Sequence, residues 1–375
     1  MKKKSLIIIS VLFLSFLITA YVAAEGLLSI QQNIIQVQTD IKGCEYEEYV
    51  KKTAESEERI QNLEEQIEQA MRDKETAQNQ NDPLGVLRAE AVISNCTEQL
   101  KESRRVLSEY ILQKDLSFYY VENREGILAK EQAEAEYSLY RSQLEISLYD
   151  CQIAYLNDLE AQMQEKLRIE EAKSWRGYST TFLIQEAETA LVQVTSQMET
   201  VKARQEFLQE EFRLKGGVVT DVSMGDEIGE LREDYLEQFR GNSIQLKYLD
   251  NQIQAYTTYL NSMNEADDNY KKAQLQLELA VLNKQQYETD LELYVKEKTL
   301  RYKEAKQNVV STEAEIELQK QKIHDSELLY EKGKITQMML IELNTELKKL
   351  EYERMSFLYE ADAAVYVLNH GIEGQ

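Results

Sequence analysis

Apolar side chains recur every three or four residues along most of this chain, which is the spacing of one face of an α-helix. The longest example covers residues 270–332, where every seventh position from Val281 to Tyr330 is apolar with a single exception. These positions are Val281, Glu288 (the exception), Val295, Tyr302, Val309, Ile316, Ile323 and Tyr330. A seven-residue hydrophobic repeat of this length imposes left-handed supercoiling on neighbouring helices. The pattern predicts a helix of roughly 95 Å that is buried along one stripe against other long helices.

Breaks in the helical pattern are few, because the 375 residues include one proline and thirteen glycines. This composition is typical of an all-α protein with long helices. The twenty-three tyrosines predict apolar seams that stay partly wet, since a tyrosine ring can be buried while its hydroxyl reaches water. The expected segments are an amphipathic piece at 25–42, helices at 45–78, 84–175, 226–260 and 270–332, breaks at 79–83 and 261–269, and a weak point at 122–126.

An internal repeat relates residues 176–216 to residues 329–371 with an offset of 156 positions. In each copy a glycine stops a helix, and a threonine three residues later is placed to cap the next helix. The superposed pairs are Gly177 with Gly333, Thr180 with Thr336, Leu183 with Met339, Glu186 with Glu342, and Leu191 with Leu347. The repeat predicts two helical hairpins of similar design.

The N-terminal residues 1–24 carry three lysines followed by an apolar run and end in Val22, Ala23 and Ala24. This pattern indicates a secretory signal peptide, and the length of the run leaves an uncleaved membrane anchor as the alternative. Either way the rest of the chain is expected outside the cytoplasm. We expect a first helical repeat at 25–217, an inter-repeat linker at 218–225 and a second helical repeat at 226–375. The first repeat turns either at Pro83 or at 122–126.

A formal net charge of −24 argues against nucleic acid and against anionic lipid as partners, because phosphate binding needs a net positive surface. Cys44, Cys96 and Cys151 are far apart, and the only histidines are His324 and His370. This set predicts no metal site and no cofactor. No nucleophile, acid or base stands at a telling spacing, so no catalytic residues and no enzyme activity are expected.

The repeated glycines and glutamates each have a simple structural interpretation. A glycine that ends a helix adopts the left-handed conformation without steric cost, and a glutamate near a helix start is favoured by the helix dipole. The alternative for Glu186 and Glu342 is a ring of carboxylates from several copies at the narrow end of a pore. The recurrence of both residue types at one repeat register favours a functional role.

At these residues the chain resembles the TolC-like outer-membrane efflux factor family. The resemblance lies in a tyrosine-containing helix end, a glycine at the hairpin tip, an apolar and acidic stretch, a long return helix and an ending with leucine and glycine. Here these features are Tyr330, Gly333, Met338–Glu342, Leu347–Tyr366 and Leu368–Gly371. The copy at residues 177–216 corresponds more loosely.

The resemblance implies a homotrimer in which each chain gives two hairpin repeats to a helical barrel around a tunnel. Gly177, Thr180, Gly333 and Thr336 would form tips that face an adaptor (membrane fusion) protein, which is linked to an inner-membrane pump. Glu186, Met339 and Glu342 would line the pore constriction. Met339 stands where the family has a second acidic residue, so the carboxylate gate is reduced.

The family also inserts two β-strands into each repeat to build an outer-membrane barrel. The segments at 79–83 and 261–269 are too short and polar for strands that span a bilayer. We therefore predict a TolC-like α-barrel protomer without β-strands, membrane-associated and located in the cell envelope. An exported coiled-coil spacer protein is the alternative function, and a periplasmic adaptor ranks third because strand-rich flanks are missing.

Overall fold

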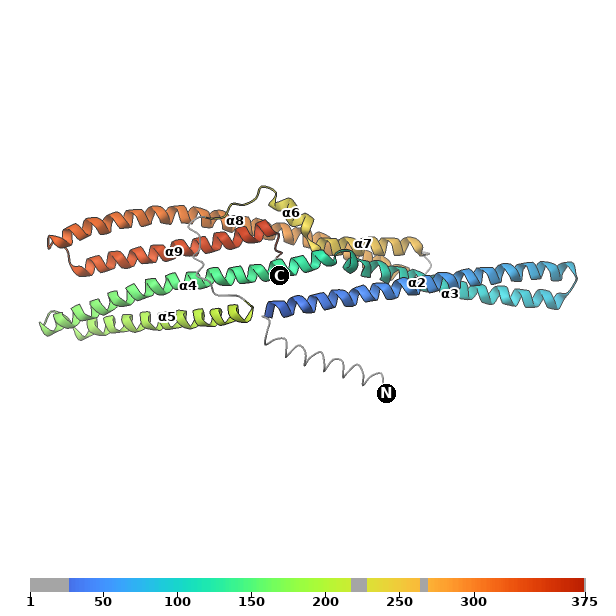
Figure 1. Cartoon of the computed structure of the whole chain (residues 1–375), viewed down its shortest axis with the longest axis horizontal. Coiled ribbons are helices and arrows are strands. Elements are labelled where there is room, and N and C mark those ends of the chain that lie inside the picture. Colours follow the sequence, from blue (N-terminus) through green and yellow to red (C-terminus); the bar gives the residue numbers. More distant parts are fainter. Residues whose placement is uncertain (1–26, 217–227, 264–268, 374–375) are drawn as a thin grey trace, which may run out of the picture. The chain divides into compact units, whose positions relative to one another are not determined.

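The computed structural model describes residues 27–216, 228–263 and 269–373, and from residue 33 onward it also describes the side chains (Figure 1). The predicted signal segment and the predicted linker at 218–225 lie outside these residues. All regular secondary structure in the described ranges is helical, which confirms the all-α prediction. The helices are α2 (Leu27–Asn79), α3 (Pro83–Glu122), α4 (Arg124–Trp175), α5 (Thr181–Leu214), α6 (Tyr235–Asn242), α7 (Ile244–Ser262), α8 (Tyr270–Glu331) and α9 (Gln337–His370).

Two predicted helix boundaries are wrong. The pieces at 25–42 and 45–78 form the single helix α2, which passes through Gly43 because one glycine costs a helix only about 1 kcal/mol relative to alanine. The helix predicted at 226–260 is divided into α6 and α7 at Ser243, whose side chain accepts a hydrogen bond from the Leu246 N–H at 3.2 Å. Ser243 therefore starts a new helix as an N-cap.

The chain reverses direction between α2 and α3, at the predicted break. Asn81 adopts a positive φ of 49°, the Asp82 side chain accepts from the Leu84 N–H at 3.1 Å, and Pro83 occupies the first helical turn. The weak point at 122–126 is a one-residue interruption at Asn123, with helical hydrogen bonds continuing on both sides. Of the two candidate turns in the first half, the structure selects Pro83.

The chain forms two compact units, and each takes helices from both halves of the sequence. Unit 1 contains Glu131–Gly241 and Leu293–Gln375 with part of the N-terminus, and unit 2 contains Asn33–Lys130 and Asn242–Glu292. The boundaries of the two expected repeats are not tested by this division and stay a prediction.

Unit 2 is a row of antiparallel helices in the order α2, α3, α7, α8. Arg104 on α3 pairs with Glu64 on α2 at 2.7 Å, and Lys284 on α8 pairs with Asp250 on α7 at 2.6 Å. Between the two hairpins, the Tyr119 hydroxyl on α3 donates to the Ile244 carbonyl oxygen at 2.7 Å. A small cluster of Leu112, Ala255, Tyr259 and Ala273 forms the core at this contact.

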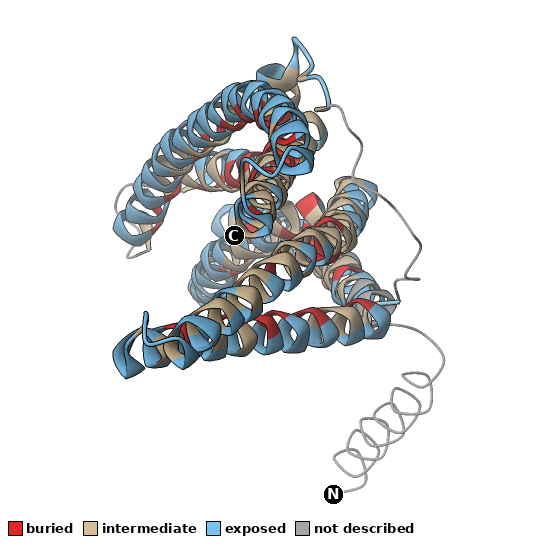
Figure 2. Cartoon of the chain, turned by 90° about the vertical axis from the view of Figure 1, so that its left-hand side faces the viewer, coloured by how far each residue is buried: buried red, intermediate tan, exposed pale blue. Residues whose placement is uncertain are grey.

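Unit 1 is a second row, in the order α5, α4, α9, α8. The Gln205 side-chain amide on α5 donates to Asp150 on α4 at 2.7 Å, and Arg354 on α9 contacts Glu313 on α8 at 2.8 Å. Leu358 on α9 is fully buried between α4 and α8. Figure 2 shows short buried stretches along the helices, set among intermediate and exposed residues.

Tyrosines join the two hairpins of unit 1 along α4 and α9. The rings of Tyr155 and Tyr352 are stacked at 6.3 Å, and those of Tyr140 and Tyr366 at 4.7 Å. All four are partly buried, which confirms the prediction of partly wet seams. Burial of the phenol raises the pKa of Tyr140 to about 12. Within the described part of the chain, no helix is apolar over enough of its length to cross a bilayer.

Candidate functional site

The first hairpin tip joins α4 to α5 through a tight helix-ending turn. Gly177 has φ 76°, its N–H donates to the Ser174 carbonyl oxygen at 2.9 Å, and the Tyr178 N–H donates to the Lys173 carbonyl oxygen at 2.9 Å. This hydrogen-bond pair defines a Schellman C-cap, which requires a left-handed residue. The Thr180 hydroxyl then accepts from the Leu183 N–H at 3.4 Å and caps α5.

The second tip, between α8 and α9, repeats this backbone with the same hydrogen bonds. Gly333 has φ 63°, its N–H donates to the Tyr330 carbonyl oxygen at 2.8 Å, and the Lys334 N–H donates to the Leu329 carbonyl oxygen at 2.9 Å. Thr336 caps α9 by accepting from the Met339 N–H at 3.4 Å, as predicted. The two sequence segments that are 156 residues apart therefore form turns of the same geometry.

Both tips lie at the same end of unit 1 (Figure 1). This follows from the antiparallel contact of α4 with α9. The Thr345 hydroxyl, near the start of α9, approaches the Asp158 carbonyl oxygen on α4 at 3.5 Å, whereas Tyr366, near the end of α9, stacks on Tyr137 near the start of α4. The α4 helix runs toward its tip while α9 runs away from its own, which brings the tips together.

Glu186, Met339 and Glu342 are exposed on the first turns of α5 and α9. Within the described residues, neither glutamate forms a salt bridge or a side-chain hydrogen bond with another residue. Their free carboxylates are available to a partner or to solvent. A ring of carboxylates needs several copies of the chain, so the pore role of these residues stays a prediction.

The two tips differ in side-chain chemistry, which sequence reasoning missed. At the first tip the exposed fractions are 92% for Trp175, 81% for Tyr178 and 69% for Phe182. The residues at equivalent repeat positions of the second tip are Glu331, Lys334 and Met338. The sequence did contain an indication of this difference, because Trp175 is the only tryptophan of the chain and lies two residues before Gly177.

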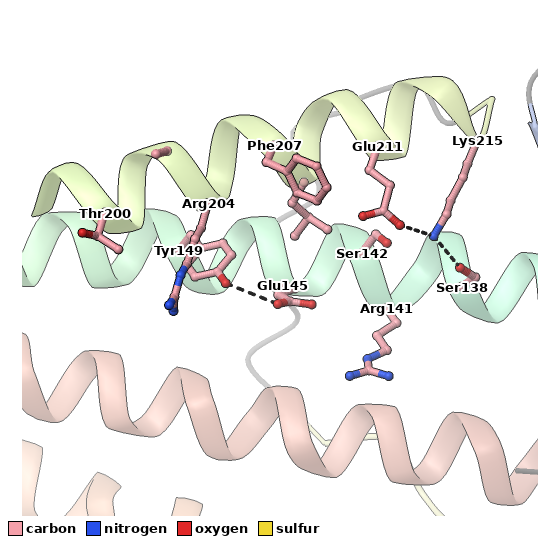
Figure 3. A pocket seen from close by; sticks show the side chains of 12 residues that line it. Ser138, Arg141, Ser142, Glu145, Tyr149, Thr200, Arg204, Phe207, Glu211 and Lys215 are labelled. Atoms are coloured by element: carbon pink, nitrogen blue, oxygen red, sulfur yellow. Dashed lines mark hydrogen bonds and ion pairs between the residues drawn. The ribbon is translucent and has the colours of Figure 1, made fainter. Parts of the chain in front are cut away.

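A groove of about 700 Å³ lies between α4 and α5 in unit 1 (Figure 3). Its polar groups largely pair with one another. Lys215 pairs with Glu211 at 2.7 Å and donates to the Ser138 hydroxyl at 3.1 Å, while the Tyr149 hydroxyl donates to Glu145 at 3.4 Å. Burial raises the pKa of Tyr149. The described residues contain no cluster of side chains that could hold a metal ion.

Comparisons with solved structures agree with this architecture. The Campylobacter jejuni CmeC outer membrane channel has a TM-score of 0.54 and 9% identity, covering 70% of this chain and 67% of its own. A membrane protein from Pseudomonas aeruginosa has a TM-score of 0.51 and 11% identity, covering 72% and 74%. The CusC channel has a TM-score of 0.50 and 11% identity, covering 84% and 95%. The sequence matches no family model and no curated protein sequence.

The described chain has the fold of a protomer of outer-membrane channels. In particular, its paired hairpins resemble the helical barrel part of TolC-like efflux channels, without strands in the described residues. At identities of 9–11% the likeness shows the fold alone.

Proposed function

We propose that this protein is the channel or conduit component of a tripartite-type efflux or secretion system in the cell envelope. It would act outside the cytoplasm, with an adaptor protein and an inner-membrane pump as partners. The single observation that carries the proposal is the duplicated tip, which places Gly177 and Gly333 in one geometry at one end of a four-helix row with the channel fold. A spacer has no need for two matched tips at the same end.

Exposed apolar stripes on the edge helices of unit 1 support association of copies into a homotrimer. The outer face of α8 exposes three leucines at helical spacing, and the other edge helix, α5, exposes Val192 and Phe207. The α8 residues are Leu293, Leu300 and Leu318. Because each edge is apolar, the α8 edge of one copy can cover the α5 edge of the next, which is a head-to-tail contact that closes into a ring.

In such a ring, Gly177, Thr180, Gly333 and Thr336 would face the adaptor at one end. Glu186, Met339 and Glu342 would surround the passage just inside that end, where carboxylates from three copies would attract cations. Residues 1–24 would direct export or anchor the chain.

The test is the assembly state and particle shape of the purified protein, by light scattering and negative-stain imaging. We expect a hollow three-fold cylinder that Leu300→Glu on α8 or Phe207→Glu on α5 converts to monomers. The matched control is Gln307→Glu, an exposed polar position on α8. A strict monomer without adaptor binding contradicts the proposal, and a thin rod supports the exported spacer instead.

A further inference from the structure

A coiled-coil seam on α3 faces away from α2 and is covered over only half of its length. Its positions alternate three and four residues apart from Leu84 to Tyr119, which is the spacing of a helix that packs on another helix. The opposite side of α3 packs on α2, where Cys96 is buried and its thiol donates to the Gln66 side chain at 3.5 Å. We call the seam that faces away from α2 the outer seam of α3.

The half of the outer seam toward the end of α3 is covered by α7. Leu112 and Tyr119 are buried there, and Leu112 belongs to one core cluster with Ala255 of α7. The α7 helix ends at Ser262, which lines a groove of about 960 Å³ together with Arg105 of α3. The contact between α3 and α7 therefore stops halfway along the outer seam.

The other half of the outer seam is exposed and apolar. The exposed fractions are 64% for Leu84 and 61% for Leu87, and Ala91 and Ser94 are exposed as well. Figure 1 shows α2 and α3 extending as a pair beyond the end of α7. This pair, residues 67–97, is called the α2–α3 arm. It continues an existing helix contact as a stripe that no described residue covers.

The charges that border the stripe do not oppose a contact between copies of the chain. On one flank Glu90 pairs with Lys74 of α2 at 2.9 Å, and on the other flank stands Arg88. The Asp82 carboxylate caps the start of α3. Glu98 is the next position of the outer seam, and like charges meeting there would repel one another. The stripe that can be covered by another copy therefore ends one turn before Glu98.

We propose that the α2–α3 arms of three copies join by packing their outer seams together along Leu84, Leu87 and Ala91. The inference rests on the ring of three copies proposed above, in which one axis relates equivalent residues. The stripe is too short to hold a free partner, because stable interfaces bury about 1,200–2,000 Å² in total. A copy that is already held in the ring needs less area, because tethering raises its effective concentration.

The joined arms have a defined geometry. Because a cyclic axis relates the copies, the three α3 helices run parallel, and each seam residue meets its own counterparts. A packed three-helix contact has no central opening. The arms therefore tie the copies together and do not continue the passage.

Disulfide cross-linking of Leu87→Cys tests this contact in a full chain without its native cysteines (Cys44→Ser, Cys96→Ala and Cys151→Ala). Mild oxidation should join most chains in pairs through position 87. The matched control is Val92→Cys, which is 45% exposed and lies about 140° further around α3. It should cross-link about ten times more slowly, because side chains on another side of α3 meet only by collision.

A second variant adds Leu84→Glu to Leu87→Cys. Three carboxylates one seam position away should slow the cross-linking about tenfold by repulsion. Glutamate in the first turn of α3 is favoured by the helix dipole, so the helix itself is not weakened. Val92→Glu in the same background is the control and should leave the rate unchanged. Circular dichroism verifies that each variant folds.

Light scattering before oxidation separates this inference from the ring itself. A mass of three copies, with faster cross-linking at position 87 than at position 92, supports the arm contact. A mass of three copies with equal rates, or with no cross-link at position 87, overturns the arm contact and leaves the ring in place. A mass of two rings assigns the stripe to contact between rings and also overturns it. A monomer contradicts the ring, and the arm contact with it.

Discussion

Tyr140 on α4 and Tyr366 on α9 stack with ring centroids 4.7 Å apart and planes inclined by 22°. Their contact joins the two hairpins of unit 1, and the Tyr137 ring on α4 also stacks on the Tyr366 ring, with centroids 5.5 Å apart. His370 stacks on Tyr366 from the next helical turn at 4.1 Å. The Tyr366 ring therefore contacts three aromatic rings, two from α4 and one from α9.

Replacing Tyr366 with alanine is expected to lower the free energy of unfolding by about 2–3 kcal/mol. The estimate combines loss of a partly buried ring with loss of stacking, which contributes about 0.5–1.5 kcal/mol beyond area burial. Urea unfolding followed by circular dichroism measures the change. Tyr178→Ala is the matched control, because Tyr178 is exposed and its loss should cost less than about 0.5 kcal/mol. Equal effects at both positions contradict the packing role.

Gly333→Ala is expected to destabilise the second tip by about 1–2 kcal/mol, since a left-handed conformation is strained for any residue with a Cβ. A Cβ at this position meets no atom within 4 Å, so the cost is conformational and not a clash. Gly43→Ala is the control, because Gly43 is helical and equally open. It should stabilise the protein by about 0.5–1 kcal/mol. Hydrogen exchange at the tip and urea unfolding report both effects, and a neutral Gly333→Ala would be inconsistent with the left-handed turn.

Asp362 on α9 gives a pH-dependent prediction. Burial raises the pKa of its carboxyl, opposed by a hydrogen bond from the Gly229 N–H. The Asp362 carboxyl then binds a proton more tightly in the folded state than in the unfolded state. The stability of the protein therefore falls as the pH rises from the pKa of Asp362 in the unfolded chain through its pKa in the folded chain. Asp362→Asn should therefore stabilise the protein at pH 7, and the gain should vanish below the unfolded pKa of about 4. Urea unfolding of both proteins at pH 7 and at a pH below the unfolded pKa measures this gain in the free energy of unfolding.

The control for this change is Glu360→Gln, at an exposed position on the same helix. It removes one negative charge without a buried carboxyl. A similar gain from both substitutions would assign the effect to net charge, and no gain from Asp362→Asn would contradict the burial argument.

The three free cysteines should differ in reaction with a maleimide. Cys44 is exposed and should react first, while Cys96 is buried between α2 and α3 and should react only after unfolding. Burial raises the pKa of the Cys151 thiol, and the thiolate is the reactive form, so Cys151 should react slowly. Timed labelling followed by peptide mass spectrometry gives the order, and early labelling of Cys96 would mean that the α2–α3 hairpin opens.

The seven-residue grid predicted the buried face of α8 well. Val295, Tyr302, Val309, Ile316 and Ile323 are all buried, but Tyr330, in the last turn of α8, is exposed. Sequence periodicity shows which face of a helix is covered and does not show which helix covers it. The contact of α4 with α9 was therefore visible only in the structure.

At the candidate site, sequence comparison identified the glycines and threonines because backbone geometry restricts residue type there. It missed Trp175 and Phe182 because an exposed side chain leaves no periodic signal. The single glycine at position 43 was also misleading, since a break in helix propensity is outweighed by continuous packing on both sides.

The two tips have the same backbone conformation but different side chains. This difference affects how many partner molecules one assembly can bind. In a trimer, six tips of two alternating kinds would face the same direction. A partner that recognises the turn formed around Gly177 and Gly333 would find six equivalent places, whereas a partner that recognises Trp175 would find three. Titration to saturation can therefore distinguish recognition of backbone shape from recognition of side chains.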